Sequence, residues 1–182
     1  MKKTSIKNER SCTAFHEAGH FVIRVRLVPE KIREKISIKR RYGTLGRSIE
    51  ETFYWDSEEL EDYKKEILIL FSGYAAHVEF NKKDQKRAWV GAEDDNQKAE
   101  NLLEEMGLKG KKRIAFSNDL REVAKKIVRQ NWKAIEEVAK ELLIVEEMSG
   151  DEGELIISHI DGDPSAARAL FEYRRFKKTL RK

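Results

Sequence analysis

Two histidines stand four positions apart, with a glutamate beside the first, inside a segment that has helical periodicity. They are His16, Glu17 and His20, and apolar residues recur at helical spacing from 11 to 27. Positions i and i+4 share one face of a helix, so both imidazoles can reach one metal ion. Imidazoles that face a core need polar partners, and a shared metal supplies them. The pattern predicts a helix carrying a metal site; the competing interpretation is two separately satisfied core histidines.

Glu17 follows His16 by one residue, which is about 100° around the helix. From there it cannot easily bind the same metal, but it can contact a water on that metal. Zinc lowers the pKa of such a water toward about 7, and a neighbouring carboxylate can take its proton and pass it to a leaving amine. The sequence therefore predicts zinc, two histidine ligands and Glu17 as the general base.

A third protein ligand is expected, because a catalytic zinc ion usually has three and keeps one open position. The segment from about 91 to 106 has helical periodicity, and Asp95 lies on its apolar stripe. The other members of the stripe are Ala99, Leu102, Leu103 and Met106. Since a buried carboxylate needs a cation, Asp95 is the candidate third ligand. The alternative interpretation is a residue in the first helical turn that interacts with the helix dipole.

The rest of the chain predicts a mostly helical α+β fold, with a small hairpin at the active site and a C-terminal helical bundle. Ile36, Ile38 and the segment 44–53 alternate like two strands joined by a turn at 41–43. Residues 81–90 are predicted as a charged loop. Further helices are expected from Asp56 to about 78, from 91 to 106, from an N-cap at Ser117 to 145, and from Asp163 onward, with Gly150 and Gly153 as breaks.

Several segments together resemble the peptidase domain of the FtsH family of zinc proteases. TAFHEAGHFVI is similar to its metal-binding motif, and KISIKRRYGTLGRS to its strand pair. LFSGYAAHVEF is similar to its "GGRAAEEI" helix, GAEDDNQKAENL to its "GASNDLERAT" segment, and MSGDEGEL to the end of the domain. The resemblance runs from about residue 11 to 156. It implies that Asp95, at the position of the family's third zinc ligand, binds zinc here.

The family's acidic pair falls on His77 and Val78 of this chain, with Glu79 displaced by one position. His77 and Glu79 are therefore candidates to orient the metal ligands from outside the coordination shell. His77 has two further interpretations, as an added ligand and as a buried polar residue without a role at the metal.

The resemblance also implies a peptidase that works on its own, because the family's membrane spans and AAA-type ATPase precede the peptidase and this chain begins almost at the motif. The expected function is an ATP-independent metalloendopeptidase for unfolded or partner-presented polypeptides. Such a substrate could pair as an added strand beside Thr44, Leu45 and Gly46. A homo-oligomer and a separate ATPase or adaptor are both compatible with this. The alternatives are a repressor-cleaving regulatory protease and a catalytically silent metal-binding module.

Length and composition limit the possible domain organisation, cellular location and binding partners of the chain. The 182 residues suit a flexible N-terminus (1–10), an FtsH-like peptidase domain (11–156) and a helical extension with a basic tail (157–182). The single cysteine, Cys12, excludes an intrachain disulfide and fits a reducing, cytoplasmic location. No apolar stretch is long enough to span a membrane, so no membrane association is expected. A net charge of +4 and few aromatic residues in the tail argue against nucleic-acid binding.

Overall fold

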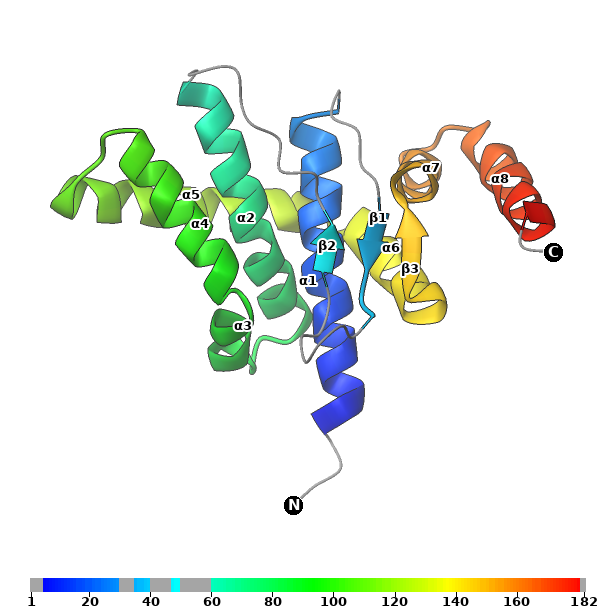
Figure 1. Cartoon of the computed structure of the whole chain (residues 1–182), viewed down its shortest axis with the longest axis horizontal. Coiled ribbons are helices and arrows are strands. Elements are labelled where there is room, and N and C mark those ends of the chain that lie inside the picture. The colour runs from blue at the N-terminus through cyan, green and yellow to red at the C-terminus, as the bar shows by residue number, and fades with distance from the viewer. Residues whose placement is uncertain (1–4, 30–34, 40–46, 50–59, 181–182) are drawn as a thin grey trace.

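The computed structural model describes residues 5–29, 35–39, 47–49 and 60–180. Helices dominate these residues, and three short strands form one antiparallel sheet (Figure 1). The elements are α1 (Ser5–Leu27), β1 (Lys35–Ser37), β2 (Arg47–Ile49), α2 (Leu60–Phe80), α3 (Gln85–Gly91), α4 (Glu93–Glu105), α5 (Gly110–Gln130), α6 (Trp132–Val145), β3 (Glu147–Ser149), α7 (Gly150–Ile160) and α8 (Ala166–Leu180). The predicted mostly helical α+β fold class is confirmed.

Helix α1 is the central element and packs against α2, α6 and the sheet (Figure 1). Its middle is apolar on most faces, which is typical of a helix surrounded by other elements. The buried apolar side chains there are Cys12, Ala14, Phe15, Ala18, Phe21, Val22 and Ile23. Their burial confirms the helix expected over 11–27, which the structure extends at its N-terminal end to Ser5.

Helices α1 and α2 approach each other closely. A Cβ atom added at Gly19 would lie 2.7 Å from the Cβ of Ala76 and 2.8 Å from the carbonyl oxygen of Ser72. Near one end of the same interface, the guanidinium of Arg24 donates two hydrogen bonds, at 2.9 and 3.2 Å, to the carboxylate of Glu66. This bidentate pair neutralises two charges that are largely shielded from solvent and fixes the register of the two helices.

The sheet has the order β2-β1-β3, and both pairings are antiparallel. Ile36 lies opposite Ser48 in β2 and Met148 in β3. The predicted pairing of the two strands is confirmed, while the turn at 41–43 lies outside the described residues. Strand β3 was not predicted, because three residues between two helices are too few to show alternation.

Three of the helix predictions were wrong in detail. Residues 85–91 form α3 inside the segment expected to be a loop. Ser117 is not an N-cap but a buried residue within α5, where its hydroxyl donates to Glu100 at 3.2 Å. Gly150 and Gly153 do not break a helix but lie in α7, which continues across residue 156, where the sequence divided the chain.

The predicted long helix over 117–145 is two helices that meet at Asn131. The side-chain amide of Asn131 donates to the carbonyl of Ile127 at 2.9 Å, and its oxygen accepts from Arg26 Nε at 2.9 Å. An asparagine side chain that bonds to its own helix competes with the helical backbone pattern. The contact with α1 therefore fixes the chain direction at this break.

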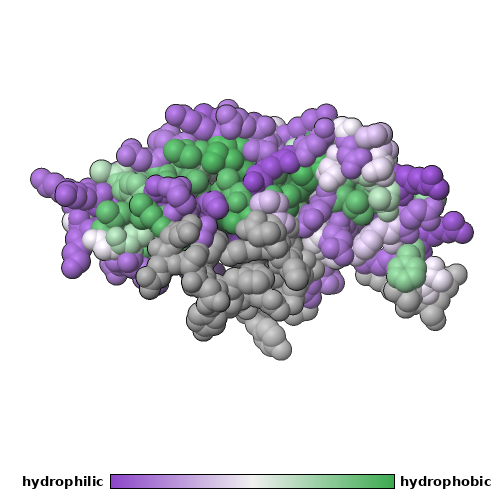
Figure 2. All heavy atoms as spheres, turned by 90° about the horizontal axis from the view of Figure 1, so that it is seen from above, coloured by the Kyte–Doolittle hydropathy of each residue, from purple (hydrophilic) through white to green (hydrophobic). Residues whose placement is uncertain are grey.

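Hydrophilic residues make up much of the face seen in Figure 2, and hydrophobic residues are visible between them. Within the parts of the chain that the structure describes, no helix is both long and apolar enough to cross a lipid bilayer.

We expect Gly19→Ala to lower the free energy of unfolding by about 1–3 kcal/mol, because the new methyl group overpacks the contact between α1 and α2. Gly91→Ala is the matched control, since a Cβ atom there meets nothing within 4 Å. That control should leave stability unchanged or raise it by up to about 1 kcal/mol. Urea denaturation of both variants measures the difference, and equal stabilities would contradict the close approach.

Candidate metal centre

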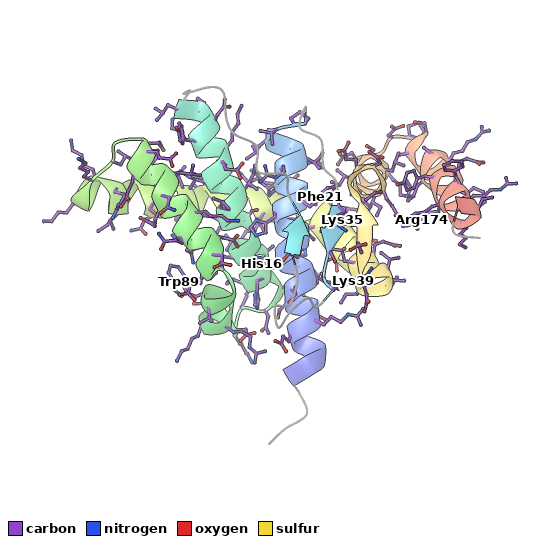
Figure 3. All side chains as sticks on the ribbon, in the orientation of Figure 1. His16, Phe21, Lys35, Lys39, Trp89 and Arg174 are labelled. Carbon is purple, nitrogen blue, oxygen red and sulfur yellow. The ribbon has the colours of Figure 1, made fainter. Side chains whose placement is uncertain are left out.

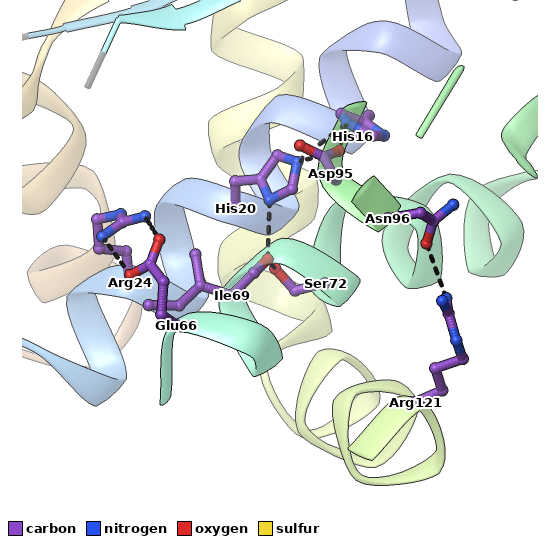
Figure 4. Close-up of polar contacts among 9 residues, drawn as sticks. All are labelled: His16, His20, Arg24, Glu66, Ile69, Ser72, Asp95, Asn96 and Arg121. Carbon is purple, nitrogen blue, oxygen red and sulfur yellow. Dashed lines mark hydrogen bonds and ion pairs between the residues drawn. The ribbon is translucent and has the colours of Figure 1, made fainter. Parts of the chain in front are cut away.

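Three side-chain atoms converge between α1 and α4. His16 Nε2 lies 3.0 Å from His20 Nε2, and each nitrogen lies 3.1 Å from Asp95 Oδ2 (Figure 4). Nitrogen and oxygen ligands around a tetrahedral zinc ion lie about 3.3–3.4 Å from one another, given metal–ligand distances near 2.0–2.1 Å. The observed triangle is close to that size. These three residues therefore fit a metal ion, and the structure brings together the three ligands named from the sequence.

The three side chains are largely buried, and Asp95 is the most exposed of them. His16, on α1, lies near the middle of the molecule in the view of Figure 3. The side chains of His16 and His20 are 11% and 7% exposed, and that of Asp95 is 17% exposed. A site of this kind holds little water, so electrostatic interactions within it are stronger than at the surface.

The backbone of α2 fixes the protonation of one ligand. His20 Nδ1 lies 2.8 Å from the carbonyl oxygen of Ile69, which can only accept a hydrogen bond (Figure 4). Nδ1 therefore carries a hydrogen, and Nε2, which faces His16 and Asp95, is the nitrogen that would bind a metal ion. Metal-binding histidines typically make such a contact, which holds the tautomer and the ring orientation.

Asp95 is held in its ionised form. Burial raises the pKa of this carboxyl, but the charge of His20 and hydrogen bonds from both imidazoles outweigh burial and lower its pKa well below the usual range. Asp95 also lies in the first turn of α4, so its position fits both the helix-dipole interpretation and the ligand interpretation. An ionised carboxylate beside two imidazoles supplies the charge that a divalent cation needs.

Packing against α2 positions the helix that carries Asp95. Ala99 and Leu103 are fully buried on the stripe predicted from the sequence, in a cluster with apolar residues of α2 and α5. Next to Asp95, Asn96 Oδ1 accepts a hydrogen bond from Arg121 Nη1 at 2.9 Å (Figure 4). The guanidinium of Arg121 also lies 3.9 Å from the centre of the Phe71 ring. Sequence reasoning missed this contact, because nothing near Arg121 in the chain indicates its partner.

Gly73 leaves the space that the two imidazoles occupy. A Cβ atom there would lie 2.3 Å from His20 Nε2 and 2.9 Å from His16 Cε1. Sequence reasoning gave Gly73 no role. The only local signal is a glycine in the interior of a helix, where it costs stability relative to alanine and so indicates a close approach.

The remaining predicted residues have other surroundings. Glu17 is buried at 6% exposure on α1. Glu79 makes ion pairs with Arg129 at 3.0 Å and Lys82 at 3.3 Å, and neither partner is one of the three converging residues. Thr44, Leu45 and Gly46 lie outside the described residues.

His77 is buried in α2 and is not one of the three converging residues. Desolvation lowers the pKa of His77, and the charge of His16 lowers it further. Its ring nitrogen Nε2 lies 3.5 Å from Asp84 Oδ2. Among the interpretations left open by the sequence, the geometry excludes a direct place in the triangle of His16, His20 and Asp95.

No family model matches the sequence, and no curated protein matches it either. What these side chains can do is therefore judged from their own geometry.

We expect Asp95→Asn to remove most bound metal, because the neutral amide supplies neither the charge nor the basic oxygen of a carboxylate. Asp94→Asn is the matched control, since Asp94 is the exposed neighbour on the same helical turn. Elemental analysis after dialysis against a weak chelator measures zinc per chain. Equal metal loss in both variants would rule out Asp95 as a ligand.

Gly73→Ala should weaken metal binding by roughly 10- to 100-fold, the usual effect of disturbing the groups that orient metal ligands. The methyl group would displace the His20 ring from its place beside His16. Competition with a chromophoric chelator measures the affinity. Unchanged affinity in a folded Gly73→Ala protein would show that the imidazoles do not need this space.

Proposed function

We propose that this chain is a zinc-dependent metalloendopeptidase. The observation that carries the proposal is the convergence of His16 Nε2, His20 Nε2 and Asp95 Oδ2 within 3.1 Å of one another. Two imidazoles and one carboxylate from the protein form a frequent ligand set of hydrolytic zinc sites, which keep a further position open. When bound, zinc supplies Lewis-acid chemistry, polarising a carbonyl group and lowering the pKa of a water toward about 7.

Glu17 is the proposed general base. It follows His16 on α1, so its side chain projects about 100° from that of the ligand and does not compete for the metal. In the proposed reaction a Glu17 carboxylate oxygen takes the proton of the attacking water and later gives it to the amine of the cleaved peptide bond. His20 Nδ1–H donates to the carbonyl oxygen of Ile69, which keeps the ring oriented while Glu17 transfers the proton.

The sheet supplies a place for the substrate backbone. β2 is an edge strand of the described sheet, and it packs beside α1 (Figure 1). An extended polypeptide could add to this edge by main-chain hydrogen bonds. This favours unfolded or partner-presented polypeptides as substrates, since an extended segment has main-chain hydrogen-bonding groups available for pairing. We place the activity in the cytoplasm, where the single cysteine stays reduced.

Glu17→Gln should abolish peptide hydrolysis while keeping the metal and the fold. The two side chains are nearly equal in size, but the amide cannot accept the proton of water, and general-base catalysis contributes about 10²- to 10⁴-fold in rate. Cleavage of unfolded casein and of a fluorogenic peptide measures the loss. Zinc content and melting temperature show that the variant is otherwise intact.

Glu79→Gln is the matched control, because the contacts of Glu79 are with Arg129 and Lys82. It should keep full activity. Comparable hydrolysis by the wild type and Glu17→Gln would remove Glu17 as the base. A wild-type protein that holds zinc and cleaves none of the unfolded substrates would instead favour the metal-binding module.

A further inference from the structure

A second group of metal-binding side chains lies one helical turn before the first. One ligand atom from each of Cys12, His77 and Asp84 lies within 4.8 Å of the others. Cys12 Sγ lies 3.9 Å and His77 Nε2 lies 3.5 Å from the same atom, Asp84 Oδ2. Around a tetrahedral zinc ion these separations would be about 3.6 Å for sulfur and oxygen and about 3.4 Å for nitrogen and oxygen.

The ring of His77 has a buried nitrogen atom without a hydrogen bond among the described residues. Its Nε2 is fully shielded from solvent, and among the described residues it makes no hydrogen bond. The residue is 5% exposed. The carboxylate oxygen Asp84 Oδ2 lies 3.5 Å from this nitrogen, within ion-pair distance. Since buried polar atoms in native proteins are nearly always satisfied, an unsatisfied ring nitrogen beside a carboxylate and a thiol indicates a cation.

The carboxylate of Asp84 does not cap α3, although Asp84 is the residue at the start of that helix. Asp84 is the N-cap residue of α3, where an aspartate usually accepts a hydrogen bond from the helix backbone. Here its side chain makes no such bond and turns toward Cys12 and His77 instead. Two backbone hydrogen bonds, from Asn81 to His77 and from Asp84 to Asn81, both at 2.9 Å, shape the turn that brings it there.

Cys12 completes the group from α1. It is the only cysteine of the chain and is 2% exposed. It lies four residues before His16, and His77 lies four residues after Gly73, so both are displaced by one turn from the first site along the α1–α2 interface. One turn is about 5.4 Å. The two groups share no ligand.

We propose that Cys12, His77 and Asp84 bind a second divalent cation of borderline softness, with Zn²⁺ as the best match. Sulfur, nitrogen and oxygen donors together select zinc over Mg²⁺ or Ca²⁺, which take oxygen ligands alone. On binding, the thiol proton leaves to solvent and the sulfur–metal bond forms. A thiolate, a carboxylate and a neutral imidazole then balance the charge of the ion.

This second ion holds the start of α3 against α1 and α2. α3 leads through Ala92 directly into α4, which carries Asp95. The ion therefore acts as a structural clamp on the arm that supplies the third ligand of the first site. The inference does not depend on peptide hydrolysis.

Cobalt substitution of the full-length protein tests the second site. Thiolate bound to Co²⁺ gives a charge-transfer band in the near ultraviolet that nitrogen and oxygen ligands do not give, and Cys12 is the sole thiol of the chain. We expect the wild type to hold two Co²⁺ or Zn²⁺ ions per chain and to show the band. Cys12→Ser should lose the band and one of the two ions.

Two further variants separate the sites. Asp95→Asn should lose the first ion and keep the thiolate band. His77→Gln, which keeps the thiol, should lose the second ion, and it stands in for Cys12→Ser should that variant fail to fold. A band that survives His77→Gln unchanged, or disappears with Asp95→Asn, would overturn a separate site.

The result is distinguishable from failure of the proposed peptidase. A wild-type protein without the band, holding one ion that Asp95→Asn removes, would overturn the second site and leave the first intact. A single ion that shows the band and resists Asp95→Asn would support the second site and count against the proposed function.

Discussion

The close contact between α1 and α2 is the constraint on which the rest of the structure depends. Glycine at 19 and at 73 lets the two backbones approach, and no larger residue fits at either position without displacing its neighbours. Polar side chains line this interface on α1 at a spacing of four residues. They are Cys12, His16, His20 and Arg24. A helical period that returns every fourth residue to one face thus places four polar groups in a row inside the fold.

The polar side chains in this row differ in the acidic partners that they have. Arg24 has a carboxylate of its own, in a bidentate pair with Glu66. His16 and His20, by contrast, share one oxygen atom of Asp95. The first pair is a complete ion pair, whereas the second group has the side-chain types and spacing of a candidate metal site. The interface therefore joins a structural ion pair to a site suited to metal chemistry, and α4 reaches it through its packing on α2.

Much of this could be predicted from neighbours in the chain. The helix over 11–27, the strand pair and the stripe that places Asp95 with Ala99 and Leu103 all follow from periodicity, which local side-chain spacing encodes. His16, His20 and Asp95 were identified because ligand types that face a core are unusual without a partner. The helix boundaries near 85, 117 and 131 were predicted less well, since each depends on a contact with a distant element. Asn131, for example, is bonded to Arg26 of α1.

By itself, the sequence determined that His16, His20 and Asp95 have the chemistry to bind a metal and which faces of their helices are apolar. Only the tertiary structure decided that these faces meet. The carbonyl of Ile69 that orients His20, the space left by Gly73 and the meeting of Cys12 with Asp84 join residues that are 49 to 72 positions apart. The partners in such contacts cannot be identified locally, because the contacts arise from how closely two helices pack rather than from the order of residues along either one.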